Sequence, residues 1–151
     1  MRMAALIVAG VLVLVGLLSA PVEAQRPPAG YVKVVTGTAV ITRAGVEKPA
    51  HPGDAVYEND VFRTGASSSV GFTLKDDTRL SLGSNSEIHL SEFKFAPAQG
   101  QLGLALKLLR GIAAFVSGRI EALRPDAVRI ETPATIVGVR GTHLVFRAEG
   151  P

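Results

Sequence analysis

Three acidic side chains within one short stretch are the first residues whose types and spacing suggest chemistry. Asp54, Glu58 and Asp60 follow one another closely, and a pair of carboxylates flanking a sugar bond is the arrangement that glycosidases use for acid and base catalysis. Asp54 follows Gly53, however, and Asp60 follows Asn59. In such pairs aspartate caps the backbone amides of a turn with its own side chain. We therefore predict two turns and no catalytic residue, and keep a small envelope hydrolase acting on cell-wall glycan as the alternative.

The three histidines give no sign of a metal centre. His51 precedes a proline, and His89 and His143 fall at outward positions of predicted strands. None stands at a recognisable metal-ligand spacing from another histidine or a carboxylate, and the chain has no cysteine. The glycines occur singly, and none opens a helix as a phosphate-binding loop would. We predict no metal, no cofactor and surface positions for the histidines.

Arg140 is the charged residue that the sequence singles out. It interrupts a β-branched run that starts at Ile136, which indicates a position near the interior. A buried guanidinium costs several kcal/mol unless it is paired. We therefore predict a structural ion pair between Arg140 and a carboxylate that the fold brings close, either Asp54 or Asp60. The alternative is that Arg140 contacts an anion or a ligand.

Apolar and polar residues alternate along most of the chain, which is typical of half-buried strands. Turn residues recur about every eight to twelve positions, and Asp76-Asp77 stands between two alternating runs as a hairpin turn. The fold class that we predict is all-β, either a short-strand sandwich or a flattened β-solenoid, after an N-terminal signal helix. The apolar positions of the alternating runs are Val70, Phe72, Leu74, Leu80, Leu82, Ile88, Leu90, Val128 and Ile130.

The segment from Leu102 to Arg124 fits two structures. It has helix-forming composition and no proline before Pro125, but its leucines also occupy alternate positions, as on a strand face. Each glycine inside it would weaken a helix by up to about 1 kcal/mol. We predict two strands with a turn at Gly111, and keep the helix as the alternative.

The N-terminus has the organisation of a secretory signal peptide. Met1-Arg2-Met3 is a short basic region, Ala4 to Ala20 is apolar apart from Ser19, and Val22-Glu23-Ala24 offers a cleavage site before Gln25. The 17 residues from Ala4 to Ala20 would span roughly 25 Å as a helix. A membrane span usually needs ~20 residues, so this run is short for one. We predict a signal peptide at 1–24, a linker at 25–33 and one domain at 34–151. A retained N-terminal anchor is the alternative.

Composition narrows the function classes further. The 16 Lys and Arg residues outnumber the 13 Asp and Glu residues, which gives a net charge of +3. The basic residues are scattered singly and form no basic stripe, so we predict no nucleic-acid partner. Because there is no cysteine, an exported domain of this size must be held by apolar burial and backbone pairing alone.

Several short motifs, in this order and spacing, resemble the FecR domain over roughly Val34 to Phe146. They are Gly53-Asp54, the segment from Asp60 through Thr64-Gly65, Leu80-Ser81-Leu82 with Asn85-Ser86, Phe115-Val116-Ser117-Gly118, and Thr132-Pro133-Ala134-Thr135-Ile136 running into Arg140-Gly141-Thr142. The resemblance implies an all-β periplasmic interaction module without catalytic residues. It also implies that Gly53, Asp54, Asp60, Thr64, Gly65, Arg140, Gly141 and Thr142 form a structural motif.

Proteins that resemble this chain include the periplasmic halves of anti-sigma regulators, which relay the occupancy of an outer-membrane receptor. Those regulators carry a cytoplasmic helical domain before their membrane span, whereas only three residues precede the apolar run here. We therefore expect an exported module that senses or binds an envelope protein or glycan, without holding a sigma factor itself. We expect it in the periplasm or secreted, and at the inner membrane only if the N-terminal segment is retained.

The segment from Thr142 to Arg147 is predicted as a strand with Leu144 and Phe146 on one face. Two arrangements are open for it. It can pair with Ile136-Val137 across a bend at Gly141, which we favour slightly. It can also lie at a sheet edge, where unpaired backbone groups are a template for strand addition by a partner or by a second copy.

Overall fold

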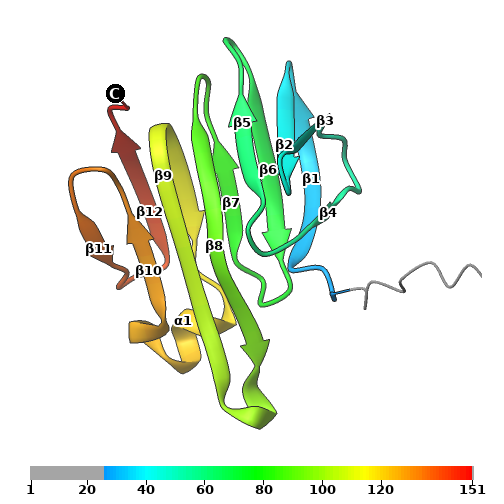
Figure 1. Cartoon of the computed structure of the whole chain (residues 1–151). Helices are drawn as coiled ribbons and strands as arrows, with labels where there is room; N and C mark the ends of the chain where they lie inside the picture. Colours follow the sequence, from blue (N-terminus) through cyan, green and yellow to red (C-terminus); the bar gives the residue numbers. More distant parts are fainter. Residues whose placement is uncertain (1–25, 151) are drawn as a thin grey trace, which may run out of the picture.

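The computed structural model describes residues 26–150 and confirms the all-β prediction (Figure 1). The predicted signal segment at 1–24 lies outside the described residues. The strands are β1 (Gly30–Thr36), β2 (Ala39–Arg43), β3 (Val46–Pro49), β4 (Ala55–Val56), β5 (Val61–Thr64), β6 (Ser69–Leu74), β7 (Arg79–Leu82), β8 (Glu87–Ala96), β9 (Gln101–Val116), β10 (Val128–Glu131), β11 (Ile136–Gly138) and β12 (His143–Ala148). The helical turns are η1 (Pro97–Gln99), α1 (Arg119–Leu123) and η2 (Pro125–Ala127).

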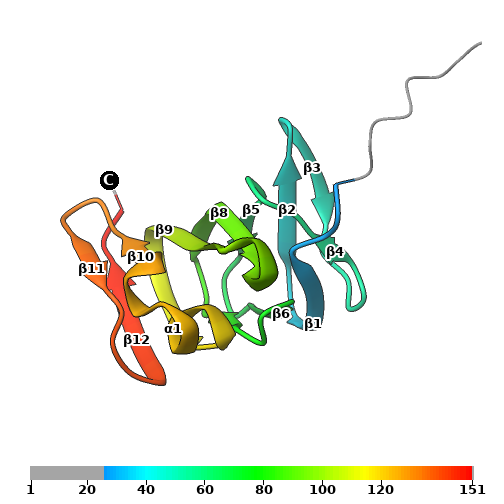
Figure 2. The same ribbon diagram turned by 90° about the horizontal axis from the view of Figure 1, so that it is seen from below.

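The strands form one sheet that curls back on itself into two layers, as Figure 2 shows from below. Layer A contains β4, β1, β6, β7, the end of β9 and β12. Layer B contains β3, β2, β5, β8, the first part of β9, β10 and β11. Every pair is antiparallel except β10 with β9. Phe62 of layer B stacks on Phe72 of layer A, with ring centroids 4.5 Å apart, so the core lies between the layers.

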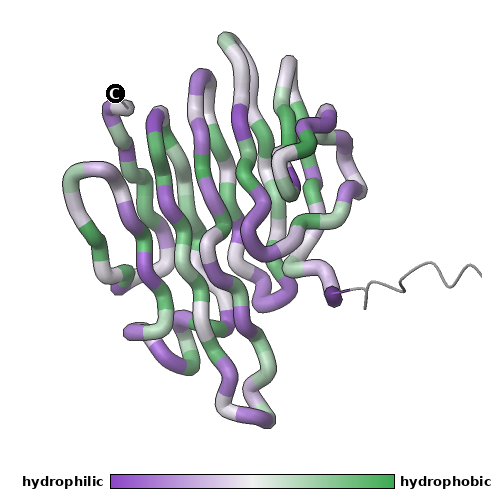
Figure 3. The backbone as a smooth tube through the Cα atoms, viewed as in Figure 1, coloured by the Kyte–Doolittle hydropathy of each residue, from purple (hydrophilic) through white to green (hydrophobic). Residues whose placement is uncertain are grey.

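The alternation in the sequence becomes the division between core and surface. The alternate apolar residues of β6, β7 and β8 are buried, and the residues between them are partly or fully exposed. Figure 3 shows the same change from hydrophobic to hydrophilic residues along the strands. The hairpin predicted at Asp76-Asp77 is confirmed, because β6 pairs with β7 and Asp77 takes a positive φ of 71°. The Asp76 side chain is buried, and its two oxygens accept hydrogen bonds from the amide and the hydroxyl of Thr78.

Two predictions about element boundaries are wrong. The segment around Gly111 is one continuous strand, β9, and not two strands with a turn. At φ 90° Gly111 bends the strand, so that β9 pairs with β8 before it and with β7 after it. The bend carries the chain from layer B to layer A while pairing continues. The first strand also starts at Gly30, so residues 30–33, which we assigned to the linker, pair with β6.

Four of the places where the chain passes from one layer to the other form a row, which we call the arch row: Gly37-Thr38, Gly65–Ser68, Gly83–Ser86 and Gly111-Ile112. Hydrogen bonds join neighbouring arches. The amide of Thr38 donates to the Ser68 hydroxyl at 2.9 Å, and the amide of Gly65 donates to the Thr38 carbonyl at 3.0 Å.

The same pattern continues along the row. The amide of Ser68 donates to the Ser84 hydroxyl at 3.1 Å, and the amide of Ile112 donates to the Ser86 hydroxyl at 2.9 Å. The Thr64 hydroxyl donates to the Gly83 carbonyl at 2.6 Å. Ser86, Thr64 and Ser68 are buried, and their hydroxyls provide partners for backbone groups that a turn would otherwise leave without one. Small hydroxyl residues and glycine are therefore required at these positions.

We predict that Gly111→Ala destabilises the protein far more than Gly100→Ala. Both glycines have positive φ, which costs an L-residue roughly 1–2 kcal/mol. A Cβ at Gly111 would also lie 2.5 Å from the Cα of Ser86, whereas a Cβ at Gly100 meets no heavy atom within 4 Å. Chemical denaturation of the two variants measures the difference. Equal losses would show that the backbones at Gly111 and Ser86 can separate without cost.

Candidate functional site

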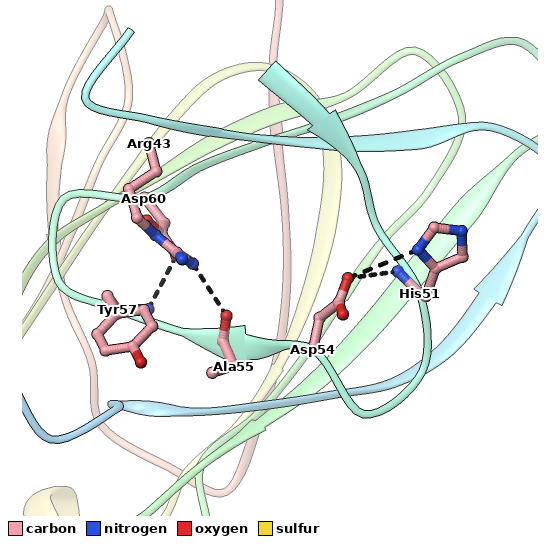
Figure 4. A network of polar contacts seen from close by, with 6 residues as sticks. All are labelled: Arg43, His51, Asp54, Ala55, Tyr57 and Asp60. Carbon is pink, nitrogen blue, oxygen red and sulfur yellow. Dashed lines mark hydrogen bonds and ion pairs between the residues drawn. The ribbon is translucent and has the colours of Figure 1, made fainter. Parts of the chain in front are cut away.

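The acidic stretch of the sequence closes one end of the sandwich (Figure 4). Asp60 is fully buried, and its carboxylate receives two bonds from Arg43, at 2.8 Å from Nε and 2.7 Å from Nη2. The amide of Tyr57 donates to the same carboxylate at 2.8 Å. Arg43 also donates to the Ala55 carbonyl and lies 4.3 Å from the centre of the Tyr57 ring. This network joins the end of β2 to the turn between β4 and β5.

Electrostatics favour the charged form of this arginine. Hydrogen bonds that Arg43 donates to the Asp60 carboxylate raise the pKa of Arg43 above its ordinary value, and this effect outweighs the opposing effect of burial. A bidentate contact between guanidinium and carboxylate fixes both position and orientation. Arg43 therefore stays charged and is held in one orientation against Asp60.

The other carboxylates of the stretch also contact backbone. Asp54 accepts the amide of His51 at 2.8 Å, in a turn where Gly53 has φ 92°. Glu58 accepts the amide of Phe93 at 2.9 Å. Asp54 and Asp60 each accept an amide three residues before them, as the predicted turns at Gly53-Asp54 and Asn59-Asp60 require, whereas Glu58 joins its turn to β8.

The predicted ion pair between Arg140 and Asp54 or Asp60 is wrong. Asp60 pairs with Arg43, and Arg140 is exposed in the segment between β11 and β12. The sheet order places β2 and β10–β12 at opposite ends of the sandwich, so the two groups cannot meet. The β-branched run misled the prediction because β11 is an edge strand. Ile136 and Val137 there are 67% and 37% exposed.

The segment around Arg140 instead covers the second end of the sandwich. Val139 is only 2% exposed and packs into the core, while Arg140 beside it faces solvent. Gly141 has φ 121°, and the carbonyl of Thr142 accepts the amide of Ser117 at 3.0 Å, which attaches the segment to the end of β9. Thr142 and Gly141 thus set the path of the chain, and Arg140 has no ion-pair partner among residues 26–150.

A groove lies beside this segment, which we call the end groove. Its volume is about 710 Å³. Its lining is mostly apolar and includes three charged residues: Asp126, Arg140 and Arg129, which is paired with Glu131 at 2.9 Å. The residues that line it are Pro125, Asp126, Val128, Arg129, Ile136, Gly138, Val139, Arg140 and Leu144. The sequence signalled this region only through the Arg140-Gly141-Thr142 motif.

The favoured pairing across the Gly141 bend is also wrong. β11 pairs with β10 in layer B, whereas β12 pairs with β9 in layer A. The intervening segment crosses from one layer to the other, so β11 and β12 cannot share a ladder. As a result both strands are edge strands within the described part of the chain.

The other groups considered as ligands lie apart. Within residues 26–150, no three His, Asp or Glu side chains come close enough to hold a metal ion. His51 contacts Asp54 at 3.8 Å in the turn described above, and His143 is exposed on β12. No helix in the described part of the chain is long and apolar enough to cross a membrane.

We predict that Arg43→Met lowers the free energy of unfolding by about 3–5 kcal/mol, because it leaves the buried Asp60 carboxylate without its cation. Arg63→Met is the matched control. Arg63 pairs with Glu47 on the surface, where an ion pair contributes about 0–1 kcal/mol. Thermal and chemical denaturation of both variants measure the effect. A similar small loss in both would mean that water replaces Arg43 at Asp60.

The comparisons with known proteins agree with this architecture. The family model described as "FecR protein" matches residues 60–151, which is more than half of the chain. No curated protein and no solved structure matched the sequence. The matched region begins at the buried Asp60 and includes the end groove, while β1–β4 precede it and complete the same sheet. FecR domains are typically extracytoplasmic signalling modules and are generally not enzymes. From the fold, the motifs and this match together, the chain belongs to the FecR family.

Proposed function

We propose that this chain is an exported, non-catalytic module of the cell envelope that senses or signals by binding a protein partner at the end groove. The observation that carries the proposal is Arg140, an exposed arginine beside an apolar groove and without an ion-pair partner in residues 26–150. Arginine offers a planar set of donors that matches a carboxylate. A partner that places an apolar side chain on the floor and an acidic group on Arg140 would satisfy both features.

Two further observations support a protein partner over the alternatives. The residues that line the end groove include no aromatic side chain, whereas carbohydrate sites rely on exposed aromatic rings. An envelope hydrolase would need two convergent carboxylates, but Asp54, Glu58 and Asp60 each bond the backbone or Arg43. The geometry therefore favours binding over glycan hydrolysis.

Export to the periplasm is part of the same proposal. It rests on the family, whose domains are typically extracytoplasmic, and on the basic, apolar and small-residue regions of the N-terminus. In this compartment the absence of cysteine makes folding independent of disulfide formation.

We predict that the mature protein begins at Gln25, because the cleavage site follows Ala24. Intact-mass spectrometry of the protein recovered from a periplasmic fraction measures the N-terminus. A protein that retains Met1 and sediments with the membrane would establish the N-terminal segment as an anchor.

We predict that Arg140→Gln weakens partner binding at least about tenfold, since loss of a charged contact at the centre of an interface typically costs more than about 1–2 kcal/mol. Its melting temperature should stay close to wild type, because exposed substitutions change stability by only about 0.5 kcal/mol. The matched control is Arg79→Gln, which removes an exposed arginine from β7 in layer A, away from the groove.

The measurement starts from affinity capture of envelope proteins on the purified chain, followed by titration of the captured partner against each variant. A partner retained by Arg79→Gln and lost by Arg140→Gln supports the end groove. A partner retained equally by all three forms would contradict it, and capture of glycan instead of protein would replace the proposed partner class.

A further inference from the structure

Strand β12 forms a long and regular free edge of layer A. It pairs with β9 from His143 to Ala148 without a register shift, and no strand of residues 26–150 lies on its other side. Its apolar side chains at Leu144 and Phe146 are half-buried, and Val145 between them is 71% exposed. An edge of this kind exposes backbone donors and acceptors to other chains.

The phase of the ladder decides which backbone groups are free. The amide of Ser117 donates to the carbonyl of Thr142, so this opposed pair is a hydrogen-bonded one. In an antiparallel ladder such pairs recur at every second residue. Thr142, Leu144, Phe146 and Ala148 therefore bond to β9, and the N–H and C=O groups of His143, Val145 and Arg147 point outward.

The hydrogen bonds on the other side of β9 agree with this phase. The amide of Gly83 donates to the carbonyl of Ile112, so β9 uses its even-numbered residues towards β7. Its odd-numbered residues, which lie opposite the even-numbered residues of β12, are then left for β12. Two independent contacts thus give the same three outward-facing residues.

The remaining edges are poorly suited to pairing. At the far end of layer B, β3 carries Glu47, Lys48 and Pro49, and proline has no amide to donate. At the far end of layer A, β4 has only two residues. Strand β11 has three residues and ends at Gly138. Strands β1 and β8 are free on one side only in part, since β4 covers the start of β1 and β5 covers the start of β8. Among the described strands of more than four residues, β12 is the one that is free along its whole length.

We propose that β12 pairs with β12 of a second copy of this chain, antiparallel about a twofold axis, and joins the two layers A into one continuous sheet. A twofold axis at Phe146 satisfies the ladder phase, because it opposes odd-numbered residues to odd-numbered ones. It places Phe146 opposite its own copy and Leu144 opposite Ala148, which extends the apolar inner face across the junction.

Polar complementarity supports the second copy as the occupant, because a histidine ring can donate a hydrogen bond to a carboxylate. In this register His143 lies opposite Glu149 twice, once on each side of the axis, and Arg147 lies opposite Val145 and not opposite another cation. A closed pair also covers the exposed Val145. The pairing uses the backbone edge of β12, whereas Arg140 lies in the end groove; Leu144 borders both, and Val145→Lys and Arg140→Gln test the two proposals separately.

The test is the mass of the purified chain in solution as its concentration increases through the micromolar range, measured by sedimentation equilibrium. We expect a dimer for the wild type. Val145→Lys should raise the dimer dissociation constant at least about tenfold, because a solvated charge on an edge opposes pairing. Ser81→Lys is the matched control: Ser81 is also exposed on the outer face of layer A, but it lies on an interior strand, between Gly71 of β6 and Ala114 of β9.

Val145→Pro gives a second arm, because it removes an outward amide that β9 does not use. If this variant fails to fold, Val145→Lys still decides the question. Hydrogen exchange should show protection of the Val145 and Arg147 amides that increases with protein concentration. A wild type that stays monomeric, a dimer that survives Val145→Lys, or equal loss in Ser81→Lys would overturn the proposal, the last by assigning the contact to the outer face of layer A.

Discussion

The four crossings of the arch row depend on backbone turns whose amides and carbonyls must find partners away from water. In the arch row these partners come from the neighbouring arch. The amide of Thr38 donates to the Ser68 hydroxyl, and the amide of Ile112 donates to the Ser86 hydroxyl. An arch by itself would leave polar groups buried and unsatisfied, at a cost of about 1–3 kcal/mol each. The arches therefore fold together, and no buried side-chain nitrogen or oxygen in the described residues lacks a partner.

The two ends of the sandwich are closed by different kinds of contact. At the end formed by β2–β4, a buried carboxylate and a bidentate arginine lock the last turn, and short or proline-containing strands follow. At the other end, Val139 fills the gap between the layers while Arg140, β11 and β12 stay accessible. The Asp60 carboxylate is occupied by Arg43 and a backbone amide, whereas the guanidinium of Arg140 and the edge of β12 have no partner among the described residues. This asymmetry gives the molecule a closed end and an accessible end, which is the binding end of our proposals.

The family match covers the two ends of the sandwich unequally. It spans the arch row from Gly65 onward and the whole binding end, while β1–β4 lie before it. Residues of the FecR-like pattern consequently serve two purposes. Thr64, Gly65, Gly53, Asp54 and Asp60 hold turns and the closed end, whereas Arg140-Gly141-Thr142 crosses the layers at the binding end.

The sequence by itself determined the properties that depend on neighbouring residues. Alternation placed Phe72, Leu80 and Leu90 in the core, and paired turn residues located the hairpin at Asp76-Asp77, because side chains on a strand point to opposite faces in turn. Only the tertiary structure decided which distant groups meet. Arg43 and not Arg140 reached Asp60, Gly111 bent a strand instead of ending it, and β11 and β12 separated into different layers. The physical reason is that the spacing of residues fixes local geometry. Ion pairs and strand partners depend instead on the spatial order of the strands in the sheet, which no local pattern encodes.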